Sequence, residues 1–161
     1  MISTLLAQHP ALFRVLLGAA VLVATLLGAV LHRADRLGAL GVLAALGLAG
    51  ALVLTLSPSS APRYAFCTVQ LTSPVAGIDA LANVVLMLPL ALFAALRWRR
   101  PLLVLAAVSG LSALVELVQA LVPALGRACD TGDWVTNTLG AVVGVLLAAL
   151  VLWFVPRRDA A

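Results

Sequence analysis

The chain has 161 residues, of which 64% are hydrophobic and 10% are charged, and its mean hydropathy is +1.19. A soluble domain carries roughly 25% charged residues, so this composition excludes a water-soluble globular protein. The net charge of +4 comes from arginines alone, because the chain contains no lysine. These arginines lie at the ends of apolar stretches, where lipid headgroups and membrane orientation account for them. We therefore expect membrane lipids as partners and no nucleic acid.

Five apolar stretches are long enough to cross a membrane, which takes about 20 helical residues. They lie at residues 13–31, 37–56, 78–96, 102–122 and 134–155. The sequence therefore predicts an all-α fold, a polytopic helical bundle of five transmembrane helices that fills residues 1–161 as a single membrane domain. The first stretch has arginines after it and, in residues 1–13, no basic side chain except His9, so we expect a retained span rather than a cleaved signal peptide.

The arginines also predict an orientation. If the connections alternate between the two sides of the membrane, one side collects Arg33, Arg36, Arg97, Arg99, Arg100, Arg157 and Arg158, and the other collects Arg14, Arg63 and Arg127. Cytoplasmic connections carry the excess of basic residues. We therefore expect the N-terminus outside and the C-terminus inside the cytoplasm.

The two cysteines are expected on the same, outer face. Cys67 lies in the long connection at 57–77 and Cys129 in the connection before the last helix. Thiols that share an oxidising compartment often pair. A Cys67–Cys129 disulfide would tie the long connection to the last helix; the alternative is two unrelated thiols.

Polar side chains recur on one face of each of the last three predicted helices. In the helix at 78–96, Asp79 and Asn83 precede Pro89, which removes a backbone donor and should kink the helix. The helix at 102–122 carries Ser109, Ser112, Glu116 and Gln119, and the last helix continues from Asp133 through Asn137, Gly140 and Gly144. Spacings of three and four residues place each set on one stripe. The Gly140–Gly144 pair allows a neighbouring backbone to approach closely.

The predicted orientation brings the outer ends of these three helices together. At about 1.5 Å per residue, Glu116 lies roughly 9 Å below the helix end near Val122, and the two asparagines come to similar depths. We therefore expect a polar, ligand-binding cup formed by Asp79, Asn83, Glu116, Gln119, Arg127, Asp130, Asp133 and Asn137.

A structural network is the alternative to a ligand site. A carboxylate inside a span costs on the order of 2.5–3.5 kcal/mol on insertion scales, so Glu116 is either neutralised, by a proton or by Arg127, or lines a hydrated pocket. Ion pairs of Arg127 with Glu116 or Asp133 would hold the helices together without any ligand. Asp130 and Trp134 also fit plain loop and interface positions.

As an ordered set, these residues resemble the VanZ-like family, named for a protein associated with teicoplanin resistance. The resemblance covers about residues 75–150 and rests on Asp79-Ala-Leu-Ala-Asn83 with Pro89, Glu116-Leu-Val-Gln119, Arg127, Asp130-Thr-Gly-Asp133 and Asn137-Thr-Leu-Gly140 followed by Gly144. The usual glycine after the proline is replaced by Leu90, which predicts different packing there. The resemblance implies a multi-pass protein of the bacterial cytoplasmic (inner) membrane and does not specify a reaction.

Three functions fit these observations. The first is a cell-envelope protein whose outward pocket binds a cell-wall precursor, lipid or glycopeptide and lowers glycopeptide susceptibility. The second is an intramembrane enzyme acting on a lipid-linked phosphate or glycan, with Glu116 or Asp133 as general base, Arg127 on a phosphate and a divalent ion conceivable on Asp130, Asp133 and Glu116. The third, a transporter or channel, lacks a continuous polar path. We expect no cofactor and assign no metal site; His9 and His32 lie far from the cup.

Overall fold

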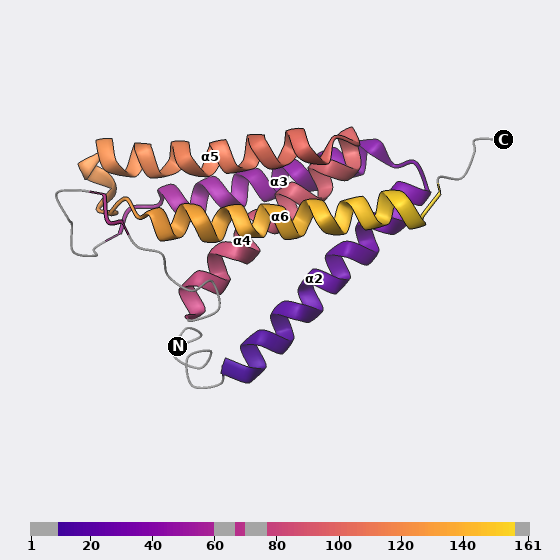
Figure 1. Cartoon of the computed structure of the whole chain (residues 1–161), viewed down its shortest axis with the longest axis horizontal. Coiled ribbons are helices and arrows are strands. Elements are labelled where there is room, and N and C mark those ends of the chain that lie inside the picture. The colour runs from indigo at the N-terminus through magenta and orange to yellow at the C-terminus, as the bar shows by residue number, and fades with distance from the viewer. Residues whose placement is uncertain (1–9, 60–66, 70–76, 157–161) are drawn as a thin grey trace.

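The computed structural model describes residues 10–59, 67–69 and 77–156, and Figure 1 shows these residues as a bundle of long helices. The helices are α2 (Pro10–Arg33), α3 (Leu37–Leu56), α4 (Ile78–Trp98), α5 (Pro101–Leu121) and α6 (Thr131–Phe154), with a short 3₁₀ helix, η1 (Pro123–Leu125), before α6. Each long helix is apolar and long enough to cross a membrane. The five predicted spans and the all-α fold are confirmed, with helix ends shifted by a turn or less.

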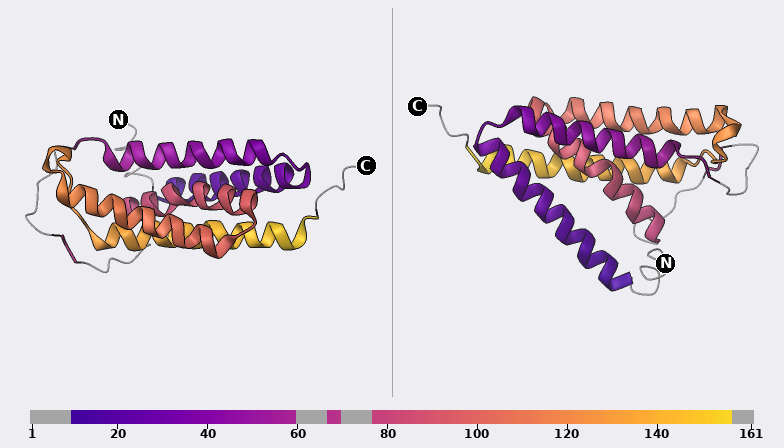
Figure 2. Two further views of the ribbon diagram at one scale, coloured as in Figure 1. Left: turned by 90° about the horizontal axis from the view of Figure 1, so that it is seen from above. Right: turned by 180° about the vertical axis from the view of Figure 1, so that it is seen from behind.

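Helix α4 forms the centre of the bundle. Between Met87 and Leu96 every residue except Pro89 is buried, whereas most residues of α2 and about half of those of α5 are exposed. A helix that is apolar on all sides is stable only when neighbours surround it or lipid does. Figure 2 shows α3, α5 and α6 aligned with the long axis of the molecule, while α4 runs obliquely and α2 diverges toward its N-terminal end. Pro89 lies inside α4 without ending it.

Close backbone contacts hold α6 against α4, as the Gly140–Gly144 pair predicts. A Cβ atom added to Gly140 would overlap the carbonyl of Val84, and one added to Gly144 would lie 2.6 Å from the Leu88 carbonyl oxygen. Side chains at these two positions would therefore push the helices apart. In a lipid environment small residues of this kind permit the tight packing that joins helices.

Leu90, the residue that follows Pro89, packs closely against α3. Leu90 is buried, and a Cβ atom added to Gly47 would lie only 3.0 Å from the Leu90 backbone nitrogen. The small residue at this crossing therefore belongs to the facing helix rather than to α4 itself. In lipid, where small residues let helices approach, α3 is thereby held close enough to α4 to reach the polar residues at its end.

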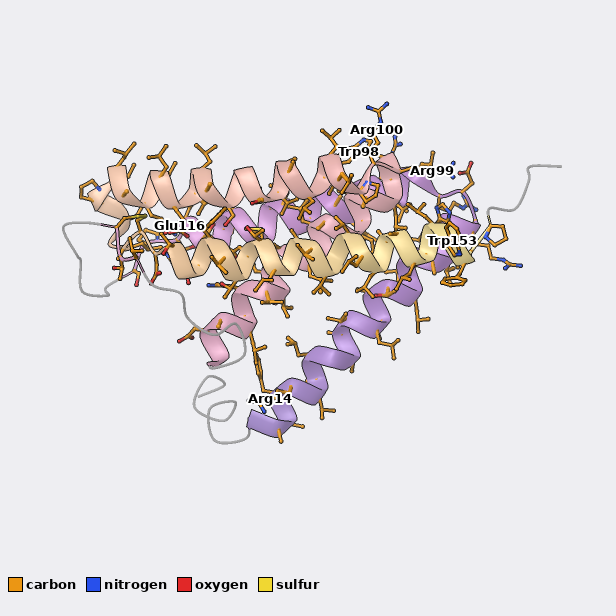
Figure 3. The ribbon with its side chains drawn as sticks, in the orientation of Figure 1. Arg14, Trp98, Arg99, Arg100, Glu116 and Trp153 are labelled. Atoms are coloured by element: carbon orange, nitrogen blue, oxygen red, sulfur yellow. A yellow bond between two sulfur atoms is a disulfide. The ribbon has the colours of Figure 1, made fainter. Side chains whose placement is uncertain are left out.

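The two ends of the bundle differ in composition. One end, which we call the hairpin end, is formed by residues 122–130 and by the neighbouring segments 57–59 and 67–69. The other end, the arginine end, contains the turns after α2 and α4 with Arg33, Arg36, Arg99 and Arg100. Figure 3 shows Glu116 near the hairpin end, and Trp98, Arg99, Arg100 and Trp153 at the arginine end.

Candidate functional site

The connection before α6 folds back tightly onto the end of α3. Gly126 has a φ of 62°, a left-handed conformation that favours glycine, and its Cα faces the carbonyl of Ser59. The Ser59 amide donates to the Leu125 carbonyl at 2.9 Å. Any other residue at position 126 would have a strained backbone, and its side chain would collide with Ser59, just after the end of α3. This glycine therefore lets the connection pass close to α3.

A second segment, Cys67–Val69, lies along the other side of the same connection. Thr68 forms a parallel bridge with Asp130, donating to the Cys129 carbonyl at 2.9 Å and accepting from the Thr131 amide at 3.0 Å. The Cys67 and Cys129 sulfur atoms are joined, with the Cα atoms 4.7 Å apart. The start of α6 is therefore fixed between α3 and the Cys67–Val69 segment.

We expect both thiols to be unavailable to an alkylating reagent until the unfolded protein is reduced, because they are consumed in one disulfide. Intact-mass measurement after alkylation, with and without reductant, checks this. The Cys67→Ser variant is the control and should expose a single thiol, that of Cys129. Two alkylated thiols without reductant would contradict the pairing.

Between these supports lies a polar cavity of about 170 Å³. It is lined by Asn83, Glu116, Gln119, Arg127, Asp133 and Asn137 together with Leu54, Thr55, Ala82 and Leu86. Six of the eight predicted cup residues thus surround one cavity. They come from α4, α5, α6 and the connection before α6, as the helical stripes predict.

Two hydrogen bonds join α6 to its neighbouring helices at the cavity. The Asn83 side-chain amide donates to Asp133 Oδ1 at 2.7 Å, and the Asn137 amide donates to Ser112 Oγ at 3.0 Å. Asn137 is only 2% exposed, yet no described residue donates to its Oδ1. An unsatisfied buried acceptor costs roughly 1–3 kcal/mol, and more than nine in ten buried polar groups have partners. Asn137 Oδ1 is therefore an exception among the described residues, and a ligand donor or an ordered water would satisfy it.

Glu116 is held in place by the start of α6. Its Oε2 atom accepts from the Asp130 amide at 2.8 Å, and the residue is 7% exposed. No described residue donates to its Oε1 atom. Glu116 also lines a second cavity of about 310 Å³, which is walled mainly by Ala113, Leu117, Ala120 and Trp134. This carboxyl group is therefore the common wall of two cavities.

Arg127 does not form the predicted ion pairs with Glu116 and Asp133. Its Nε atom donates to the Ser57 carbonyl and its Nη2 atom to the Leu54 carbonyl, each at 2.8 Å. The last carbonyls of a helix lack intrahelical donors, and a cation is favoured there by the helix dipole. The guanidinium therefore caps α3 instead of neutralising a carboxylate.

Gln119 takes part in the same cap. Its side-chain amide donates to the Thr55 carbonyl at 2.9 Å. The Leu54 carbonyl is without its usual helical partner because residue 58 is a proline, which has no amide hydrogen. Arg127 and Gln119 thus both cap the end of α3 and line the cavity. One guanidinium nitrogen of Arg127, Nη1, donates to no described residue.

The two remaining cup residues lie outside the cavity. Asp79 is exposed in the first turn of α4. Asp130 is the N-cap of α6, where its Oδ1 atom accepts from the Gly132 amide at 2.8 Å, and it lines the second cavity. Trp134 lies beside it and donates to the Ser109 carbonyl at 3.3 Å. These positions match the plain loop and interface roles that the sequence also allowed for Asp130 and Trp134.

Sequence reasoning missed the contribution of α3, from which the predicted cup contained no residue. Leu54 and Thr55 line the cavity, and their carbonyls receive the Arg127 and Gln119 side chains. The available signal was Pro58, four residues after Leu54, since a helical carbonyl that faces a proline needs a donor from elsewhere. A free arginine or glutamine in a later outer segment is the natural donor.

The cavity is rich in acceptors. Glu116 and Asp133 line it with carboxyl groups, and its side-chain donors are those of Arg127, Asn83, Gln119 and Asn137. No group of three or more His, Cys, Asp or Glu side chains within residues 10–59, 67–69 and 77–156 is placed to hold a metal ion. The arrangement therefore suits a ligand that donates hydrogen bonds, such as one bearing amino or hydroxyl groups.

Comparison with protein families gives a match to the model described as VanZ/LLP1 over residues 42–153. The matched region begins within α3 and ends within α6, so it contains the whole cavity. Comparisons with curated proteins and with solved structures give no match.

Proposed function

This chain belongs to the VanZ/LLP1 family, and from that premise we propose that it is a bacterial cell-envelope protein whose polar cavity binds a cell-wall precursor, an envelope lipid or a glycopeptide. The binding takes place at the extracytoplasmic end of the bundle and lowers glycopeptide susceptibility. The observation that carries the proposal is one small polar cavity lined by the carboxyl groups of Glu116 and Asp133 and by Asn137, whose buried Oδ1 atom accepts from no described residue. A ligand donor at this position would remove the cost of the orphan acceptor.

The placement at the outer end rests on the arginines. Arg33, Arg36, Arg97, Arg99 and Arg100 gather at the end opposite the cavity. By the positive-inside rule this end faces the cytoplasm, so the hairpin end with its disulfide faces the oxidising side, where disulfides persist. Charge distribution and cysteine chemistry support the same orientation independently.

Replacing Asn137 with leucine is expected to abolish the function while leaving the protein as stable as before, within about 1 kcal/mol. The change removes the orphan acceptor, whose burial is unfavourable, along with the donor to Ser112. Glycopeptide susceptibility and envelope composition of cells carrying the variant should match those of a deletion strain. Thermal unfolding in detergent measures stability.

The control is Thr136→Val on the same helix. Thr136 is also 2% exposed, but its hydroxyl bonds within α6, to the Gly132 carbonyl at 2.9 Å, and lines neither cavity. This variant should keep the function. If Asn137→Leu lowers stability and function in parallel, Asn137 serves to hold α6 against α5 rather than to bind a ligand. If deletion itself changes neither susceptibility nor envelope composition, the proposed function is wrong.

A second candidate function is acid–base catalysis on a lipid-linked phosphate or glycan. It is favoured by the two carboxyl groups, Glu116 and Asp133, that line the same small cavity, because paired carboxyls suit proton transfer. Glu116→Gln separates the two functions. The glutamine keeps an oxygen that accepts from the Asp130 amide but transfers no proton. Binding alone predicts a weakened but retained phenotype, because Asp133 still supplies a carboxyl group to the cavity, whereas catalysis by Glu116 predicts complete loss.

A further inference from the structure

A cavity of about 530 Å³ lies at the arginine end, far along α5 from the polar cavity, where α4 turns into α5. It is lined by Trp98, Arg100, Leu103, Val104 and Ala107. Trp98 and Leu103 are each 59% exposed, so the hollow is a groove on the outer surface of the bundle. In a membrane, that surface meets lipid.

One wall of the groove is apolar and follows the first turns of α5. Leu103, Val104 and Ala107 lie at i, i+1 and i+4, so they share a face of the helix. Val104 is 4% exposed and forms the floor, while the small side chain of Ala107 leaves the hollow open. From residue 103 to residue 107 this wall extends about 6 Å along the helix toward the middle of the membrane. An alkyl chain fits such a wall.

The other end of the groove is cationic. Arg100 lines it directly, and Figure 3 shows Arg99 and Trp98 beside it at the same end of the bundle. Among the described lining residues there is no carboxylate, and the first turn of α5 contains no acidic residue. Trp98 has the position of an interfacial aromatic at headgroup level. The groove therefore pairs an apolar wall with a positive tip.

We propose that this groove binds one anionic phospholipid, with its phosphate on Arg100 and an acyl chain along Leu103, Val104 and Ala107. A guanidinium presents two parallel donors to phosphate oxygens, and an anionic headgroup, unlike a zwitterionic one, leaves no ammonium to repel it. The positive field of the neighbouring arginines adds to this preference. The site is separate from the polar cavity and does not depend on the ligand proposed there.

The test is native mass spectrometry of the full chain exchanged into micelles with phosphatidylglycerol or phosphatidylcholine of identical acyl chains. Retention of phosphatidylglycerol is expected to be about tenfold higher, since one charge-assisted pair supplies a difference of that order. Arg100→Gln should reduce it to the phosphatidylcholine level. Arg36→Gln is the matched control, because Arg36 is exposed at the same end but lines no part of the groove, and it should change retention less than twofold.

A second pair of variants tests the apolar wall. Ala107→Phe fills the groove and should lower the retention of both lipids, whereas Ala106→Phe, exposed one position away and outside the groove, should not. If the first variant does not fold, Leu103→Asn replaces it, with the same expectation. Equal losses of phosphatidylglycerol retention in Arg100→Gln and Arg36→Gln would show that headgroups bind non-specifically to all arginines at this end, and would overturn the proposal. Unchanged retention in Ala107→Phe, or displacement of the lipid by inorganic phosphate, would also overturn it.

Discussion

Gly140→Ala is expected to separate α6 from α4 and to lower the free energy of unfolding by about 3 kcal/mol, at the upper end of overpacking costs. The added methyl group would overlap the Val84 carbonyl. A backbone atom in the middle of a helix cannot turn away as a flexible side chain can, so the whole helix must shift. Denaturation in mixed micelles, followed by tryptophan fluorescence, measures the change.

The matched control is Gly110→Ala on α5. Gly110 is exposed, and nothing lies within 4 Å of a Cβ atom added there. Alanine is favoured over glycine inside a helix by roughly 0.5–1 kcal/mol, so this variant should be slightly more stable than the parent. If both variants behave alike, the close α4–α6 contact is wrong.

The same substitution should also damage the polar cavity. Asn83 precedes Val84 on α4, and its side chain bonds to Asp133 on α6 at 2.7 Å. Movement of α6 away from the Val84 carbonyl would stretch this bond and open the cavity at the Asn137 position. The glycine pair and the polar stripe therefore act together. Close packing of α6 against α4 at Gly140 fixes the positions of the polar side chains one helical turn away.

Sequence predicts those features of this fold that depend on the pattern of side chains. Spans follow from length and hydropathy alone, and all five were found. The stripes on three helices predict their inward faces because helical spacing fixes which residues point together, and Asn83, Glu116 and Asn137 do surround one cavity.

Features carried by the backbone were not found. The Thr68–Asp130 bridge carries no side-chain pattern, and Pro58 marks an α3 carbonyl that needs a donor without identifying Arg127 as that donor. An arginine near two carboxylates suggests ion pairs from sequence, but unsatisfied helix carbonyls attract a guanidinium equally well. The choice between these partners depends on where α3 ends in space, which the order of residues does not state.

Arg127→Ala is expected to lower the free energy of unfolding by about 2–3 kcal/mol, because it removes two charge-assisted hydrogen bonds from the partly exposed end of α3. Arg127→Lys should recover only part of this loss, since an ammonium cannot present the planar pair of donors that reaches both the Leu54 and Ser57 carbonyls. Unfolding in mixed micelles measures both variants.

The Pro58→Ala substitution decides why Arg127 matters. An alanine at position 58 supplies the amide hydrogen that the Leu54 carbonyl lacks and lets Ser57, now extended with a ψ of 134°, join the helix. In the double variant the loss caused by Arg127→Ala should therefore shrink by about 1 kcal/mol, a coupling that a double-mutant cycle resolves. If Arg127 acts instead as a counter-charge for Glu116 and Asp133, Pro58→Ala leaves the full loss in place, and the ion-pair network returns as the explanation.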